Sequence, residues 1–256
     1  MTRKLINKKI YEIRRNIIKL SFKSNSAHLG SSLSVVEIIF ACLYFKIKNK
    51  ITTEIIFSKG HAAMAYYASL YQFKLIRKKL LDDYLKENST LWAHISKKNN
   101  QYFKFSFGSL GYGLGISAGI SLGYKTKGKK SKIFCILSDG ELNEGSIWES
   151  LMFISHHNLK NITILIDSNK IQSFGRTEEV INLKHIKKVF KNLNYHVHTV
   201  NGHNFEDIYK TMKKDSSRPK ILICNTIKGR GLKSIENTIS SHYKPATLEQ
   251  LKIYEK

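Results

Sequence analysis

One acidic and one amide side chain stand directly after two strand-like runs of the chain. Asp139 follows the apolar run 132–138, KIFCILS, and Asn169 comes shortly after the run 161–167, NITILID. The helix-like segment between the runs would return the chain to the same edge of a parallel sheet, so the two side chains are expected to meet. Carboxylate and amide oxygens are hard ligands that suit Mg²⁺ or Ca²⁺, and such sites leave positions for phosphate oxygens. The pair therefore predicts a metal site for a phosphate-bearing ligand.

Gly140 supports that interpretation. A residue without a Cβ lets the backbone approach a diphosphate closely, and a following helix offers its amino end to negative charge. The alternative is that Asp139-Gly140 and Asn169 are ordinary turn residues, because Asp, Asn and Gly dominate turns for local reasons. Each residue alone fits a turn, but their combined placement at two strand ends favours the metal site.

Strand-like and helix-like segments alternate along the chain and must position these side chains. This alternation predicts parallel strands joined by right-handed crossovers, hence an α/β fold with a layered, mostly parallel sheet and helices on both faces. The first 26 residues form a basic amphipathic pattern, and Ser34 to Glu37 has the S-x-x-E form of a capping box, which predicts a helix start. The expected strands are 54–58, 132–138, 161–167, 195–200 and 219–225.

The overall composition limits the class of protein. No apolar run approaches the roughly 20 residues that span a bilayer, and Cys42, Cys135 and Cys224 show no disulfide or zinc spacing. We therefore expect a soluble, cytoplasmic protein that does not bind membranes. The net charge of +24 raises the alternative of nucleic-acid binding, but the lysines are dispersed and no recognition module is visible. Specific nucleic-acid binding is not expected.

Ser138-Asp139-Gly140, with Asn169 thirty residues after the acid, resembles the thiamine-diphosphate signature, which is normally Gly-Asp-Gly followed by Asn. The surrounding text, SDGELNEGSIWESLMFISHHNLKNITILIDSNKIQSFGRTEEV, resembles the N-terminal, diphosphate-binding subunit of split transketolases. Further blocks carry the resemblance from about His28 to His242: SAHLGSSLSVVEI, SKGHAAMAYYASL, GSLGYGLGISAGISLG and SHYKP.

The resemblance implies the roles of particular residues in a thiamine-diphosphate-binding fold. The divalent ion, expected to be Mg²⁺ with Ca²⁺ or Mn²⁺ as alternatives, would be held by Asp139, Asn169 and the backbone carbonyl of Ile171. Imidazole suits hydrogen bonds to sugar hydroxyls and proton transfer near neutral pH. His28, His94 and His242 are accordingly the expected catalytic residues. The expected cofactor contacts are His61, Gly108, Ser109, Leu110, Asp139, Gly140, Asn169 and His242.

Other histidines and glycines receive a structural interpretation. Six histidines in predicted helices, strands or an exposed junction are expected to be structural: His156, His157, His185, His196, His198 and His203. The segment from Gly113 to Ala118 also satisfies the G-x-G-x-x-A pattern of a dinucleotide site, with KFSF as a conceivable preceding strand. That pattern is common by chance, and Asp139 is better explained together with Asn169.

The implied activity is transfer of a two-carbon ketol unit from a ketose phosphate to an aldose phosphate, as in carbohydrate metabolism of the pentose-phosphate type. The cofactor's pyrimidine ring binds a separate domain in this family, and no second α/β module follows residue 225. We therefore expect one domain, 1–256, with the N-terminal helix and His28 loop in 1–30 and a tail carrying His242 in 226–256. A separate pyrimidine-binding transketolase subunit would complete the site, most simply in an α2β2 complex.

The sequence departs from the family pattern at a few positions, and other functions share its acid-to-Asn signature. Ser138 stands where Gly is usual, and a positive φ there would be costly for a residue with a Cβ. Phe174 replaces a usual Asp before Gly175. The alternative functions are a deoxyxylulose-phosphate synthase-like enzyme, a 2-oxoacid dehydrogenase α-like subunit, and a non-catalytic binding protein that keeps the fold.

Overall fold

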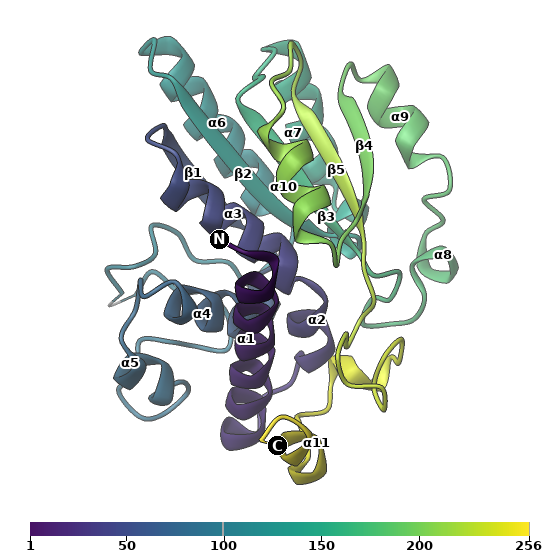
Figure 1. Ribbon diagram of the computed structural model, residues 1–256. Helices are drawn as coiled ribbons and strands as arrows, with labels where there is room; N and C mark the ends of the chain where they lie inside the picture. The colour runs from purple at the N-terminus through teal and green to yellow at the C-terminus, as the bar shows by residue number, and fades with distance from the viewer. Residues whose placement is uncertain (99, 256) are drawn as a thin grey trace.

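A five-stranded sheet forms the centre of the computed structural model, which describes residues 1–98 and 100–255. The strand order is β1-β2-β3-β5-β4 and every neighbouring pair is parallel (Figure 1). This confirms the predicted α/β class. Residues 99 and 256, which belong to the predicted single domain, lie outside the described residues. The strands are β1 (Thr52–Phe57), β2 (Ser131–Ser138), β3 (Ile162–Ser168), β4 (His196–Asn201) and β5 (Lys220–Asn225).

The central strands are nearly continuous apolar runs because helices cover both faces of the sheet. Residues 133–137 of β2 are fully buried, as are most residues of β3. The register pairs Ser138 of β2 with Asp167 of β3. The carboxyl ends of these two strands are therefore level, and the residues that follow them lie at one edge of the sheet.

Helices occupy the connections between strands. In Figure 1, α10 lies in front of the sheet and α7 behind it; α10 packs on α3, and α7 packs on α6. The helices are α1 (Arg3–Ser24), α2 (Leu29–Ser34), α3 (Val36–Lys48), α4 (Ala63–Gln72), α5 (Lys78–Asp82), α6 (Tyr112–Thr126), α7 (Gly145–His156), α8 (Thr177–Val180), α9 (Ile186–Asn192), α10 (Phe205–Lys213) and α11 (Leu248–Ile253), with short 3₁₀ turns η1 (Gly60–Ala62), η2 (Gly140–Asn143) and η3 (Ser240–His242).

The predicted capping box at Ser34 is wrong. Helix α2 ends at Ser34, and α3 follows with Val35 as an N-cap that makes no side-chain hydrogen bond. The Ser34 hydroxyl instead donates to Asp167 at 2.6 Å, and Glu37 binds Arg14. Both side chains are buried, so partners distant in the sequence replace the local capping bonds.

The dinucleotide alternative fails on topology. Gly113, Gly115 and Ala118 all lie inside α6, and the segment before α6 contributes an isolated bridge between Ile95 and Phe107 rather than a strand of the sheet. A Cβ on Gly113 would stand 2.3 Å from Cβ of Ser58. The glycine therefore serves close packing of α6 against the end of β1.

Two sequence expectations about the chain's environment can be compared with the structure. Within residues 1–98 and 100–255, no helix is long and apolar enough to cross a membrane. The three cysteines are buried and unpaired, each with its Sγ inside the core, as their isolated positions in apolar segments predicted.

Candidate active site

A cleft of about 440 Å³ opens at the carboxyl ends of β1, β2 and β3. Parallel α/β sheets bind ligands at this edge. Most of the predicted site residues line it. The lining comprises His28, Ser31, Lys59, His61, Gly108, Leu110, Ser138, Asp139, Gly140, Asn143, Glu144, Asn169, Ile171, Gln172, Ser173, Phe174, Val180, Ile181 and His242. Ser109 and His94, also predicted, lie next to these residues in the chain or in space rather than in the wall.

The predicted metal ligands come together through the loop that follows β3. Lys170 N donates to the Asp139 carboxylate at 2.7 Å, and Ile171 N donates to Oδ1 of Asn169 at 3.1 Å. These backbone bonds fold residues 169–171 around the carboxylate. Lys170 adopts φ 66°, a conformation uncommon for a residue with a Cβ. The expectation that Asp139 and Asn169 lie at one edge is thereby confirmed.

Asp167 orients the amide of Asn169. The Asn169 Nδ2 donates to Asp167 at 3.3 Å, so the amide oxygen is the atom left for Ile171 N and for a cation. Asp167 is itself paired with the buried ammonium of Lys59 and accepts from the Ser34 and Thr226 hydroxyls. Although burial opposes it, the charge of Lys59 holds the pKa of Asp167 below its usual range.

Asp139 differs from Asp167 in its electrostatic environment. Burial, reinforced by the nearby Asp167 charge, raises the pKa of Asp139 to about 6. Its carboxylate accepts hydrogen bonds from backbone N–H groups of Lys170 and Gly140. Asp139 is therefore ionised near neutral pH yet lacks an ion-pair partner among the described residues. A divalent cation would neutralise it.

Four predicted histidines form one cluster beside the cleft. The ring of His28 lies 4.8 Å from His242, 5.5 Å from His61 and 5.7 Å from His94, centroid to centroid. His28 and His242 are more than two hundred residues apart in the sequence, and α2, η1 and η3 bring them together with His61. His28 has φ 64° and its N–H donates to the His242 carbonyl at 2.9 Å.

These imidazoles are neutral at pH 7. Burial, together with the neighbouring His94 ring and the charges of Lys228 and Lys59, lowers the pKa of His28 to about 4. Burial and Lys228 lower the pKa of His242 to about 3. Burial lowers the pKa of both His61 and His94. A neutral imidazole has one donor and one acceptor nitrogen, so the cluster can bind hydroxyl groups from either side.

Lys228 ties the metal loop to the histidine cluster. Its fully buried ammonium donates to the Ile171 carbonyl at 3.1 Å and lies 3.2 Å from Nδ1 of His242. An ammonium can only donate, so Nδ1 of His242 accepts and Nε2 carries the proton. The Ile171 carbonyl has two lone pairs, so it can accept from Lys228 and still bind a cation.

Glu141 holds three cleft segments in place. Its buried carboxylate accepts from the Ser58 hydroxyl at 2.5 Å, from Gly111 N at 3.2 Å and from Ser138 N at 2.8 Å. It thus joins the ends of β1 and β2 to Gly111, the residue just before α6. Burial raises the pKa of Glu141, while these hydrogen bonds oppose the shift.

Ser138 carries no backbone strain. It is absent from the described residues with positive φ, so the Cβ that replaces the family's hydrogen costs nothing there. Its hydroxyl lies 3.3 Å from Glu141 Oε2. Gly140 lines the cleft, and the Gln172 side chain lies 3.4 Å from the position that a Cβ on Gly140 would take.

Sequence reasoning missed Lys59, Lys228 and Glu141. Lys59 was visible beside His61 in SKGH, and Glu141 directly follows Asp139-Gly140. Lys228 stands in IKGRG, where Gly229 and Gly231 adopt positive φ. All three are charged residues that stand next to a glycine or a predicted site residue in the sequence. This signal is weak, and it identifies them as site residues only once their burial is known. The six histidines interpreted as structural do not line the cleft.

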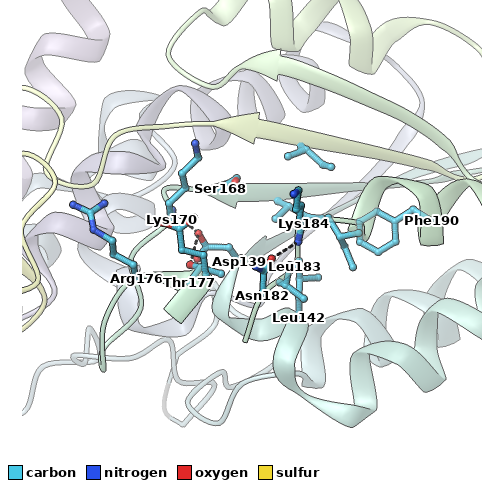
Figure 2. A pocket seen from close by; sticks show the side chains of 14 residues that line it. Asp139, Leu142, Ser168, Lys170, Arg176, Thr177, Asn182, Leu183, Lys184 and Phe190 are labelled. Carbon is cyan, nitrogen blue, oxygen red and sulfur yellow. Dashed lines mark hydrogen bonds between the residues drawn. The ribbon is translucent and has the colours of Figure 1, made fainter. Parts of the chain in front are cut away.

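Asp139 also lines a second cavity, of about 560 Å³ (Figure 2). Its walls include the apolar side chains of Leu142, Leu183 and Phe190, and its polar residues include Lys170 and Thr177, both of which hydrogen-bond Asp139. Within the described part of the chain, Asp139 is the one residue shared by the linings of the two cavities. Asp139 thus lies between the two cavities, with its carboxylate held by Lys170 N and the Thr177 hydroxyl.

The fold and cleft define an α/β protein of the thiamine-diphosphate-binding class. Residues 7–255 match the family model described as transketolase, thiamine diphosphate binding domain, and the chain belongs to this family. It is accordingly one subunit of a thiamine-diphosphate-dependent transketolase, which is a transferase.

Similar proteins include two transketolase subunits of comparable length. An apulose-4-phosphate transketolase subunit from Actinobacillus succinogenes is 32% identical over 93% of this chain and 90% of its own. A 6-deoxy-6-sulfo-D-fructose transketolase subunit from Clostridium sp. is 30% identical over 94% of this chain and 91% of its own. The crystal structure of Pichia stipitis transketolase with sedoheptulose 7-phosphate shares the fold, with TM-score 0.86 and 22% identity over 97% of this chain and 41% of that chain.

Proposed function

We propose that the cleft binds thiamine diphosphate with Mg²⁺, and that this chain and a pyrimidine-binding subunit together transfer a ketol unit between sugar phosphates. The observation that carries the proposal is the convergence of Asp139, Asn169, Ile171 and the histidine cluster on one cleft. Carboxylate, amide and carbonyl oxygens are the donor set that Mg²⁺ prefers, with Ca²⁺ and Mn²⁺ as alternatives. We further propose that residues 1–256 form one diphosphate-binding domain.

The cleft fits a diphosphate in shape and charge. Nothing lies within 4 Å of the position of a Cβ on Gly108, so this backbone is open to a ligand. Two buried lysines add positive charge: Lys59 lines the cleft, and Lys228 bonds the lining residues Ile171 and His242. Among the described residues, Asn143 Oδ1 and Gln172 Nε2 are buried without a hydrogen-bond partner, and both residues line the cleft. Such atoms call for a ligand.

Roles for the chain's residues follow from this placement. Asp139, Asn169 Oδ1 and the Ile171 carbonyl would hold the metal ion against the diphosphate. His61, Gly108, Ser109, Leu110 and Gly140 would contact the cofactor. Thiamine diphosphate, when bound, supplies the nucleophilic carbanion and the electron sink for carbon–carbon cleavage. The protein supplies orientation, hydrogen bonds and protons.

The histidine cluster would bind the hydroxyl groups of the donor sugar. His28, His94 and His242 are neutral at pH 7, so each can donate one hydrogen bond and accept another. The proton of His242 lies on Nε2, because Lys228 occupies Nδ1. Nε2 can therefore donate to a substrate oxygen, and His28 or His94 can accept a hydroxyl proton.

Exposed apolar side chains around the cleft fit a second subunit. Phe174 is 86% exposed, Tyr112 is 61% exposed and Ile181 is 51% exposed, although Phe174 and Ile181 line the cleft. Large exposed apolar residues at a site mark protein contacts. The similar proteins of comparable length are named as subunits. We infer that the partner is a pyrimidine-binding transketolase subunit, most simply in an α2β2 complex in the cytoplasm.

A reconstitution assay tests the function. The chain, the pyrimidine-binding subunit, thiamine diphosphate and Mg²⁺ are mixed with xylulose 5-phosphate and ribose 5-phosphate, and with apulose 4-phosphate and 6-deoxy-6-sulfofructose as other donors. We expect ketol transfer from at least one donor only when both chains are present. Turnover by this chain alone would refute the shared site, and pyruvate decarboxylation without ketol transfer would assign a different thiamine enzyme.

A further inference from the structure

A buried cluster of three side chains lies away from the cleft. Arg14 of α1 donates from Nη2 to both carboxylate oxygens of Glu37 in α3, each at 2.8 Å, and Nδ1 of His203 lies 3.3 Å from Glu37 Oε2. The side chains are 9%, 6% and 11% exposed. Although burial opposes it, the Arg14 charge lowers the pKa of Glu37. None of the three lines the cleft.

Each end of the cluster binds the backbone of the same loop. Arg14 Nε donates to the Arg230 carbonyl at 3.1 Å, and Ile227 N donates to Nε2 of His203 at 2.8 Å. A backbone N–H can only donate, so Nε2 accepts and the ring proton lies on Nδ1, from which it donates to Glu37. The cluster therefore binds the backbone on both sides of Lys228, at Ile227 and at Arg230.

The loop between these two bonds is built from turns: Arg230 N donates to the Ile227 carbonyl at 3.2 Å, and Asn237 N donates to the Lys228 carbonyl at 2.9 Å. Gly229 and Gly231 adopt φ 80° and 101°, which residues with a Cβ rarely adopt, and the loop contains no described helix or strand. Its other fixed points include Gly229 N, which donates to the Gly30 carbonyl at 3.0 Å. To these backbone bonds, Arg14 and the Glu37-bound His203 add side-chain anchors on either side of Lys228.

We propose that Arg14, Glu37 and His203 are positioning residues that set the place of the Lys228 ammonium, and through it the Ile171 carbonyl and the His242 ring. The chain of contacts runs from Glu37 through His203 to Ile227 N, and from Lys228 Nζ to Ile171 O and His242 Nδ1. The inference rests on the proposed function, because its consequence is cofactor affinity.

A double-mutant cycle tests the proposal on the assembled two-subunit complex. The dissociation constant for thiamine diphosphate with Mg²⁺ is measured for the wild type, His203→Ala, Lys228→Met and the double variant. Loss of the hydrogen bond between Ile227 N and His203, the bond that reaches the Lys228 loop, predicts a weakening of about tenfold for His203→Ala. In the Lys228→Met background, His203→Ala should cause less than about a twofold further change, because the group it positions is gone.

Rescue and matched controls separate positioning from general stability. His203→Gln keeps one donor and one acceptor and should restore most of the affinity, whereas His203→Leu should not. Arg15→Ala, at the exposed neighbour of Arg14, should leave the dissociation constant unchanged. Thermal unfolding of each complex is recorded alongside.

The outcomes are distinct. Equal weakening by His203→Ala with and without Lys228 would overturn the positioning role, as would unchanged affinity in His203→Ala. Failure of the wild-type complex to bind thiamine diphosphate would instead refute the proposed function, and the present inference with it.

Discussion

The amide of Asn169 donates from Nδ2 to the Asp167 carboxylate at 3.3 Å, which turns its oxygen toward Ile171 N, 3.1 Å away. This bond decides which end of the amide meets a cation. Asp167 can serve this purpose because Lys59 keeps it charged inside the core. The buried Lys59–Asp167 ion pair thus orients Asn169, a predicted metal ligand, without supplying a metal ligand of its own.

Asp167→Asn should destabilise the chain strongly. The substitution leaves the Lys59 ammonium buried without its partner, which typically costs about 3–5 kcal/mol of unfolding free energy. Urea denaturation measures the loss. Asp215→Asn is the matched control, because Asp215 is 98% exposed and its pair with Lys132 should contribute less than about 1 kcal/mol. Equal stability of the two variants would show that the Lys59 pair contributes little.

Gly60→Ala should disturb the segment that carries His61. A Cβ there would stand 2.0 Å from the Phe107 carbonyl oxygen, a backbone atom that cannot rotate away. Overpacking of this kind costs about 1–3 kcal/mol or more, and we expect weaker thiamine diphosphate binding as His61 shifts. Gly119→Ala is the control, since nothing lies within 4 Å of that Cβ position and α6 should gain about 0.5 kcal/mol. If Gly60→Ala folds with wild-type stability and binds thiamine diphosphate unchanged, the close approach of Gly60 to the Phe107 carbonyl is contradicted.

The sequence was informative where function depends on strand ends. Asp139 and Asn169 follow long apolar runs whose period and length define β2 and β3, so their shared edge could be predicted. The histidine cluster needed the family resemblance, because nothing local relates His28 to His242. Lys228 and Glu141 could not be recognised as buried groups, since their partners lie in segments that only the folded chain brings near.

The capping box predicted at Ser34 and Glu37 is a case in which a local pattern was present but did not form the expected structure. Ser34 and Glu37 have the right types and spacing, but local rules assume exposed side chains that lack better partners. Arg14 and Asp167 supply those partners across 23 and 133 residues. Burial made the long-range bonds stronger than the local ones.

Binding of thiamine diphosphate through the metal should weaken below pH 6. The ionised carboxylate binds the ion, and burial raises the pKa of Asp139 to about 6, above its unfolded value near 3.8. Protons therefore compete below about pH 6, and affinity should fall about tenfold per pH unit there and be flat from about pH 6.5 to 8. Fluorescence titrations across about pH 4.5–8 measure this profile. A flat profile through pH 5 would exclude Asp139 as the titrating ligand.

The metal and diphosphate site at Asp139 is the central claim, and calorimetric titration of thiamine diphosphate into the assembled complex tests it most directly. Wild type and Asp215→Ala should bind with Mg²⁺ and lose at least about a hundredfold in affinity when the metal is chelated. Asp139→Ala should bind weakly in both conditions. Metal-dependent binding by Asp139→Ala with wild-type affinity would contradict the account.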